Sequence, residues 1–166
     1  MEPSDALSTA AQIAVTLAGF AGVVVVFRKE SVHEWSAMNK FRLRLLLANS
    51  LLPLAFCMVG MMLLSIKPTP VWIWRGASGF AAACLISFPV VMIHRGLAGG
   101  SIRITGSSRF VFYPLSVLGT MGTLLEIYNV AKLNVFWAFY APIVFQILTA
   151  TVQFVRIILL PPEEES

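Results

Sequence analysis

The chain has 166 residues, of which 58% are hydrophobic and only 12% are charged, and its formal net charge is +4. Soluble domains average about 25% charged residues, and a chain this short buries only about 70% of its surface, so a water-soluble fold could not hide this much apolar area. The apolar runs are continuous rather than alternating, which excludes a membrane β-barrel. The composition therefore predicts an all-α integral membrane protein of the cytoplasmic (inner) membrane.

Five apolar segments approach the roughly 20 residues that a helix needs to cross the hydrocarbon core of a bilayer. These predicted spans are residues 7–27, 43–66, 71–94, 110–128 and 135–160. The fourth is the shortest, so four spanning helices with a re-entrant segment at 110–128 form the alternative. Lys and Arg gather in the loops after the first and third spans. The positive-inside rule places these loops in the cytosol. The chain is therefore predicted to be one helical domain with its N-terminus outside and its C-terminus inside.

The first span carries a ladder of small residues and, on a neighbouring face, a polar stripe. The ladder consists of Ala10, Ala14, Ala18 and Gly22. Small residues at every fourth position let two helices approach closely, so this face is expected to pack and to favour a homo-oligomer. The polar stripe contains Gln12 and Thr16. It serves either interhelical hydrogen bonds or a water-filled pore, because polar groups in hydrocarbon need a partner.

The loop at 28–42 is basic and is predicted to lie in the cytosol. Ser31 and Glu34 have the spacing of a capping box, which indicates a short helix at the membrane interface. In that interpretation Trp35 lies at the depth of the lipid headgroups, and nearby cations face anionic lipid. These cations are Lys40, Arg42 and Arg44. A solvated loop that only fixes the topology is the alternative.

Residues 95–109 form a second basic loop, which is rich in Gly and Ser, and residues 161–166 form an acidic tail. Cys57 and Cys84 each lie inside an apolar span, without the CxxC spacing or the partnering histidine of a metal site. Both are expected to be small buried hydrophobic residues. The sequence therefore predicts no metal ion and no cofactor.

Glu126, in the fourth span, is the one acidic residue between Arg44 and Arg156. An ionisable residue inside a span indicates an ion path or a proton relay by default. Because Glu126 lies close to the outer end of its span, we expect water to reach it. Arg75 begins the third span on the same side of the membrane, so an Arg75–Glu126 ion pair and an ion-attracting carboxylate are both open. Thr123 lies one turn before Glu126 and continues its polar stripe.

The fifth span repeats the polar stripe of the first. The members of this stripe recur at spacings of three and four residues, which places them on one helix face. They are Gln146, Thr149, Gln153 and Arg156. Packing through hydrogen bonds and lining of a pore both explain the stripe. Arg156 alone is explained as an anchor that reaches the membrane interface.

The sequence contains no residue set on which to base an enzyme. Neither histidine has a carboxylate at metal-ligand spacing, and there are no paired acids and no phosphate-binding loop. The positive charge belongs to the loops, so it predicts membrane topology rather than nucleic-acid binding. No motif marks a known family.

The leading hypothesis is therefore a homo-oligomeric pore or small transporter. In this hypothesis the polar stripes of the first, fourth and fifth spans line a water-accessible path for ions or protons. The alternative is a non-conducting assembly, sensor or effector module that binds other membrane proteins or anionic lipid. An enzyme that acts on lipid at the cytosolic surface is a third hypothesis.

Overall fold

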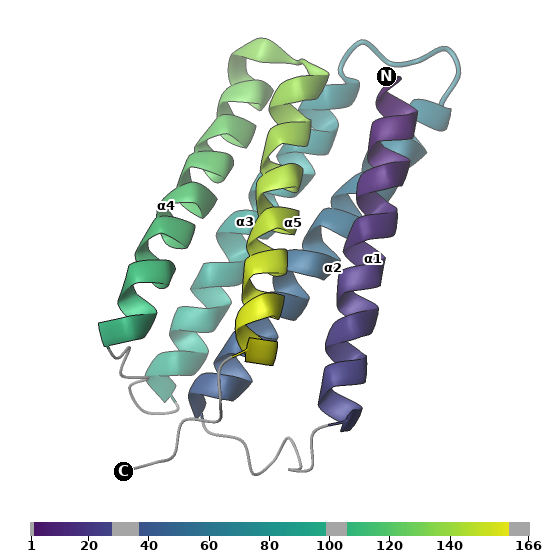
Figure 1. The fold of residues 1–166 in the computed structure, drawn as a ribbon. Coiled ribbons are helices and arrows are strands. Elements are labelled where there is room, and N and C mark those ends of the chain that lie inside the picture. Colours follow the sequence, from purple (N-terminus) through teal and green to yellow (C-terminus); the bar gives the residue numbers. More distant parts are fainter. Residues whose placement is uncertain (1, 28–36, 99–105, 160–166) are drawn as a thin grey trace.

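The computed structural model describes residues 2–27, 37–98 and 106–159, and within these ranges the chain contains no strand. The helices are α1 (Pro3–Phe27), α2 (Ala37–Ser65), α3 (Ile73–Ala98), α4 (Gly106–Tyr128) and α5 (Phe136–Leu159), with a π-helical turn at Asn129–Leu133. Successive helices run in opposite directions, so the start of α1 and the end of α5 lie at opposite ends of the bundle (Figure 1). The end at which α1 begins is here called the upper end, and the other is the lower end.

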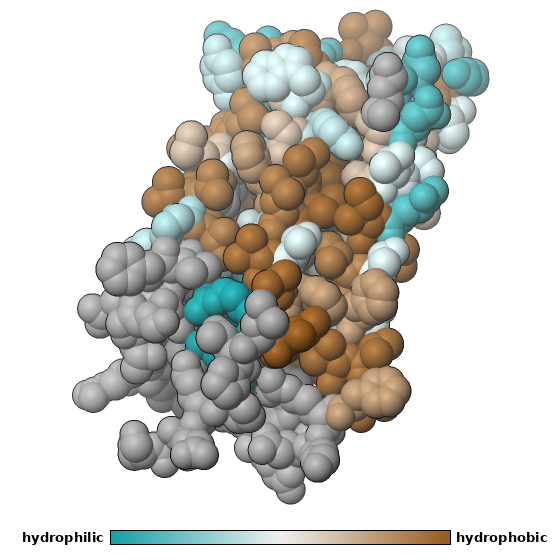
Figure 2. Space-filling model, in the orientation of Figure 1, coloured by the Kyte–Doolittle hydropathy of each residue, from teal (hydrophilic) through white to brown (hydrophobic). Residues whose placement is uncertain are grey.

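Four of the helices, α1, α2, α3 and α5, are long and apolar enough to cross a membrane. Apolar side chains also cover most of the visible face between the two ends of the bundle (Figure 2). Apolar side chains that are at least 46% exposed include Ile13, Phe20, Met58, Val117 and Leu148. A water-soluble monomer rarely exposes so large a contiguous apolar surface, so the bundle is compatible with a multi-pass membrane protein.

The α4 helix is not among those four. It nevertheless runs as one continuous helix beside α3 and α5, from the lower to the upper end (Figure 1). A re-entrant segment would return to the end from which it started. The observed path of α4 is instead that of a full member of the bundle.

Several helices extend beyond the predicted spans. The α2 helix begins at Ala37 instead of residue 43, so Lys40, Arg42 and Arg44 lie in its first turns and not in a loop. Residues 95–98 belong to α3 and residues 106–109 to α4, so both ends of the predicted loop at 95–109 are helical. A hydropathy boundary stops at the first charges, whereas Lys, Arg, Met and Ala are good helix formers and continue the helix. Trp35 and the predicted interfacial helix lie outside the described residues.

The buried apolar core is formed by residues of α1, α2, α3 and α5. Leu7, Phe56, Phe139 and Ile143 are fully buried there. Gly60 lets α1, α2 and α5 meet, because a Cβ atom at this position would lie 2.9 Å from Leu7 Cδ1 and 3.2 Å from Phe139 Cε1. The absence of a side chain at residue 60 therefore sets how closely α1 and α5 approach α2.

The substitution Gly60→Ala tests this contact, and Gly119→Ala is its matched control. The first is expected to destabilise the protein by about 1–3 kcal/mol, because the added methyl group overpacks the core. The second is expected to be neutral, or to stabilise by up to about 1 kcal/mol, because no atom lies within 4 Å of a Cβ at Gly119 and Ala is the better helix former. Thermal unfolding in detergent micelles measures both, and equal effects of the two substitutions would contradict this account of the core.

Candidate functional site

A hydrogen-bonded junction at the upper end fastens the α4–α5 turn to α3. The buried Asn129 side chain donates from Nδ2 to Ser78 Oγ of α3 at 2.7 Å and to the Val135 carbonyl at 3.1 Å. Its Oδ1 accepts the Val135 N–H at 2.9 Å. One amide group therefore joins the end of α4, the start of α5 and the first turns of α3.

Asn134 completes this upper junction. Its backbone has φ 53°, in the left-handed region that Asn tolerates better than most residues, and its N–H donates to the Asn129 carbonyl at 3.0 Å. The side-chain Oδ1 accepts the backbone N–H of Arg75 at 3.0 Å, and Nδ2 donates to the Val71 carbonyl at 2.6 Å. Because the first N–H groups of a helix have no partner inside it, Asn134 caps α3 from a distant part of the chain.

Glu126 lies one turn before this junction, on the face of α4 that packs inward. Gly122, Glu126 and Asn129 are all buried, and Glu126 is fully so. The Ser78 hydroxyl is the polar neighbour of the carboxyl group. The hydrogen-bond geometry is not met there, however, and neither carboxyl oxygen has a hydrogen-bond partner.

The predicted Arg75–Glu126 ion pair does not form, because the Arg75 side chain is exposed while both Glu126 oxygens are unpartnered. The expected water-accessible position of Glu126 is likewise not observed. Helical spacing explains the difference: Glu126 stands four residues after Gly122, which packs on Pro142 of α5, and three before Asn129. The carboxyl group therefore points into the interface between helices.

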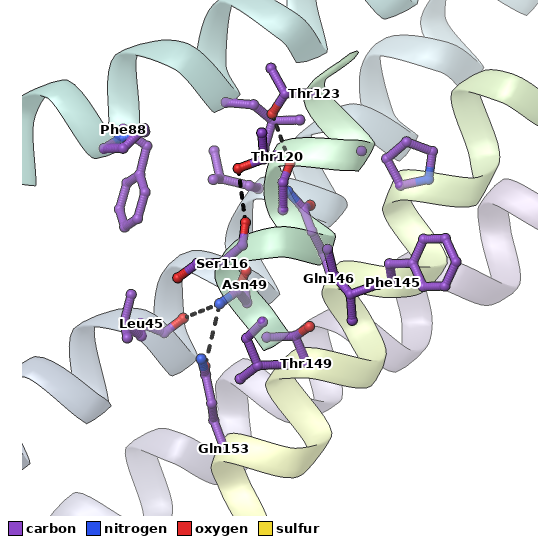
Figure 3. A pocket seen from close by; sticks show the side chains of 18 residues that line it. Leu45, Asn49, Phe88, Ser116, Thr120, Thr123, Phe145, Gln146, Thr149 and Gln153 are labelled. Atoms are coloured by element: carbon purple, nitrogen blue, oxygen red, sulfur yellow. Dashed lines mark hydrogen bonds between the residues drawn. The ribbon is translucent and has the colours of Figure 1, made fainter. Parts of the chain in front are cut away.

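Below this interface, α2, α3, α4 and α5 surround a cleft with a volume of about 300 Å³ (Figure 3). The polar side chains of its wall come from α2, α4 and α5. They are Asn49, Ser116, Thr120, Thr123, Gln146, Thr149 and Gln153. The rest of the described wall is apolar, and none of the described lining residues is charged.

The cleft exists because α4 packs closely on α5 only in its upper half. A Cβ atom at Gly122 would touch Pro142 at 3.4 Å, whereas one turn lower a Cβ at Gly119 would meet nothing within 4 Å. Ser116 and Thr120, which line the cleft, are also exposed. Close packing at Gly122 thus closes the cleft above, and its lower part is open beside α4.

Most polar groups of the wall already have partners inside the protein. Asn49 Nδ2 donates to the Leu45 carbonyl at 3.0 Å and to Gln153 Oε1 at 3.4 Å, which links α2 to α5. The Thr120 and Thr123 hydroxyls each donate to the carbonyl four residues earlier, at 2.9 Å (Figure 3). Such bonds satisfy a hydroxyl group within its own helix.

Gln146 is the exception in this wall. Its side chain is only 9% exposed, and Oε1 has no hydrogen-bond partner. The two glutamines of the α5 stripe therefore differ. Gln153 accepts a hydrogen bond from Asn49 and so joins α5 to α2, whereas Gln146 faces the cleft with an unpartnered carbonyl oxygen.

The structure brings together only part of the predicted site. Thr123, Gln146, Thr149 and Gln153 all line the cleft, whereas the half-buried Arg156 does not. The predicted site residues did not include Asn49, although it is the one amide residue in the predicted span 43–66. Sequence reasoning also missed the apolar wall that α3 contributes, for which the sequence carries no periodic signal.

The polar stripe of α1 lies elsewhere. Gln12 and Thr16 are exposed, α1 contributes no residue to the cleft, and the Thr16 hydroxyl donates to the Gln12 carbonyl at 2.7 Å. Hydrophilic side chains run down the edge of the molecule that α1 forms (Figure 2). Within one chain, the three predicted stripes therefore do not enclose a single path.

The small-residue ladder of α1 is largely used inside the bundle. Ala10 and Ala14 are buried in the core, Ala18 is half-buried and Gly22 is exposed with no atom within 4 Å of a Cβ there. The ladder turns gradually from the packed to the open face, because a repeat of four residues exceeds the 3.6 residues of a helical turn. Its upper half packs against the chain's own helices and is not free for a second copy.

Within the described ranges, no three His, Cys, Asp or Glu side chains gather to hold a metal ion. Cys57 is buried and Cys84 is half-buried, and both are free thiols. The chemistry of the cleft is therefore hydrogen bonding by amide and hydroxyl groups against an apolar wall.

Comparison of the chain with protein-family models, with curated proteins and with solved structures finds no match in any of the three.

A double-mutant cycle of Arg75→Gln and Glu126→Gln tests the separation of these two side chains. Because Arg75 is exposed and Glu126 is buried without it, the coupling free energy is expected to be below about 0.5 kcal/mol. Breaking a buried ion pair would instead cost about 3–5 kcal/mol. Thermal unfolding of the unsubstituted protein, the two single variants and the double variant in micelles gives the coupling free energy. A value above about 1 kcal/mol would show that Arg75 and Glu126 form an ion pair.

Proposed function

We propose that this protein is a small multi-pass transporter of the cytoplasmic membrane, in which the cleft is the substrate site. Five helices cross the bilayer, with the N-terminus outside and the C-terminus inside, so the upper end faces out. The observation that carries the proposal is the convergence of polar side chains from α2, α4 and α5 on one cleft of about 300 Å³ in an otherwise apolar bundle. Polar groups at this depth are costly unless they bind one another or a ligand.

The chemistry of the wall favours a neutral solute over an ion. Ion sites inside membranes use charged side chains or rings of backbone carbonyls that replace the hydration shell. The described residues of the cleft form neither kind of ring, and none of them is charged. Amides and hydroxyls suffice for a neutral polar group, which loses less hydration energy on entering.

The closed upper end of the cleft supports a carrier rather than an open channel. Packing of Gly122 on Pro142 and the junction of Asn129 with Ser78 lie between the cleft and the upper end. A carrier exposes its site to one side at a time. In the described part of the chain the cleft is open beside α4, below Gly122, and in our proposal movement of α4 about its fastened upper end would open the other side.

A second candidate is a homo-oligomer that conducts, or that only assembles, through α1. The exposed stripe of Gln12 and Thr16 favours it, because a glutamine amide facing lipid lacks a partner. A second copy of the chain offers the same amide, and an amide pair satisfies its own donor and acceptor. Gly19, which also has no atom within 4 Å of a Cβ, leaves room for the approach of a second helix.

Flux into proteoliposomes tests both candidates with a matched pair of glutamine substitutions. The carrier is expected to take up neutral solutes no larger than its cleft, from a panel of polyols, amides and medium-chain alcohols, faster than empty liposomes do. Gln146→Leu is expected to lower this uptake at least about ten-fold, as loss of one buried hydrogen bond implies. Gln12→Leu is expected to leave it unchanged, because α1 does not reach the cleft.

Conductance for K⁺, Na⁺ and protons is measured in the same preparations and is expected to equal that of empty liposomes. Ion conductance that Gln12→Leu abolishes and Gln146→Leu spares would support a pore between copies around α1. Absence of any flux, combined with a stable assembly of several copies, would support the non-conducting module and contradict the carrier.

A further inference from the structure

Among the described residues that line the cleft, Gln146 has a buried side-chain oxygen without a hydrogen-bond partner. Its side chain is 9% exposed and points from α5 into the cleft (Figure 3), yet Oε1 is buried without a partner. A buried amide without a hydrogen-bond partner destabilises a protein. The unpartnered oxygen of Gln146 therefore lowers the stability of the fold, and a hydrogen bond from a molecule outside the chain would offset this loss.

The surroundings of Gln146 define the polarity of that binding partner. Thr149 lies one turn below it on the same face of α5, and Ser116 and Thr120 of α4 stand on the opposite wall. Leu45, Leu85 and Phe88 fill the remainder with apolar surface. A molecule that matches the cleft therefore has a polar head and an apolar body.

The hydrogen-bonding groups on the wall favour a head that donates. The Thr120 and Thr123 hydroxyls use their hydrogens on their own helix and retain only acceptor capacity. Asn49 uses its Nδ2 group in both of its hydrogen bonds, so its carbonyl oxygen, like that of Gln146, is an acceptor. A hydroxyl group supplies the donor and can also accept from the Gln146 amide nitrogen.

The charge of the site excludes an ionised head. Among the described residues, none that lines the cleft is charged, and Glu126, the nearest described acid along α4, is buried above the cleft without lining it. A carboxylate or an ammonium group in this wall would lose its hydration without gaining a counter-ion.

We propose that the cleft binds an uncharged amphiphile, with its hydroxyl head against Gln146 and its apolar body against the wall of α2 and α3. This inference rests on the proposed function, because it names the substrate class of the same site. The volume of about 300 Å³ accommodates roughly ten groups of the size of a water molecule or a methylene. A medium-chain alcohol such as 1-decanol is therefore a suitable probe.

Equilibrium dialysis of radiolabelled 1-decanol against the full-length protein in lipid nanodiscs tests the proposal, with empty nanodiscs as the reference for partition into lipid. A saturable component is expected above that reference. Unlabelled 1-decanol is expected to displace it at least about ten-fold more effectively than decanoate or decylammonium, which share the chain and carry a charge. Displacement by a monoacylglycerol at lower concentration than by 1-decanol would assign the natural ligand to the bilayer lipids, and the reverse order to free alcohols.

Three variants locate the bound head. Gln146→Leu is expected to weaken saturable binding at least about ten-fold, the loss of one hydrogen bond to a buried group. Gly119→Leu is expected to block binding by filling the open space beside α4, and it leaves Gln146 in place should Gln146→Leu fail to fold. Gln12→Leu, at the exposed glutamine of α1, is expected to bind as the unsubstituted protein does.

Absence of a saturable component would overturn the proposal, and so would equal displacement by decanoate or binding unaffected by both cleft variants. Absence of a saturable component would mean that water alone forms hydrogen bonds with the Gln146 side chain. The binding experiment can fail independently of the flux experiment that tests the proposed function. Saturable 1-decanol binding without flux of any solute would overturn the transporter and retain this site, whereas flux without saturable binding would overturn this ligand class and retain the transporter.

Discussion

The fastening of the α4–α5 turn to α3 is the constraint on which the rest of this structure depends. Two asparagines achieve it: Asn129 bonds Ser78 and both backbone groups of Val135, and Asn134 caps the first turn of α3 through Arg75. In an apolar bundle each such amide is costly unless every group finds a partner, so the two amides specify one register of α4 and α5 against α3. The α4 helix is thereby held at its upper end, and its lower end is left to diverge.

The cleft and the burial of Glu126 both follow from that arrangement. Close packing of α4 on α5 ends at Gly122. Above this position Glu126 is enclosed, and below it the polar faces of α4 and α5 separate around about 300 Å³ of space. The most unusual residue of the sequence is therefore part of the packed interface, and the unpartnered oxygen that faces the cleft belongs to Gln146, one helix away.

Much of the fold could be predicted from hydrophobic run length, because the bilayer requires about 20 apolar residues of every spanning helix. The predicted helix ends were less accurate, because Lys40 and Arg42 end the apolar run of the second span but lie inside the α2 helix. Within the site, the spacing of three and four residues placed Gln146, Thr149 and Gln153 correctly on one face. The same spacing on α1 predicted a comparable stripe, but periodicity reports only that residues share a face. Which face meets which helix depends on contacts such as that of Gly60 with Leu7 and Phe139, which no local pattern encodes.

The central claim is that the lower halves of α4 and α5 enclose an accessible cleft instead of packing together. The most direct measurement is the reaction of N-ethylmaleimide with single cysteines at Thr149, which lines the cleft, and at the adjacent Ala150, which is fully buried. Cys57 and Cys84 are first replaced by alanine, and because maleimide reacts with the thiolate, its rate reports access of water. We predict that Thr149→Cys reacts in the folded protein while Ala150→Cys is protected until unfolding. Equal protection of both cysteines would show that the polar faces are sealed by packing and would contradict the account.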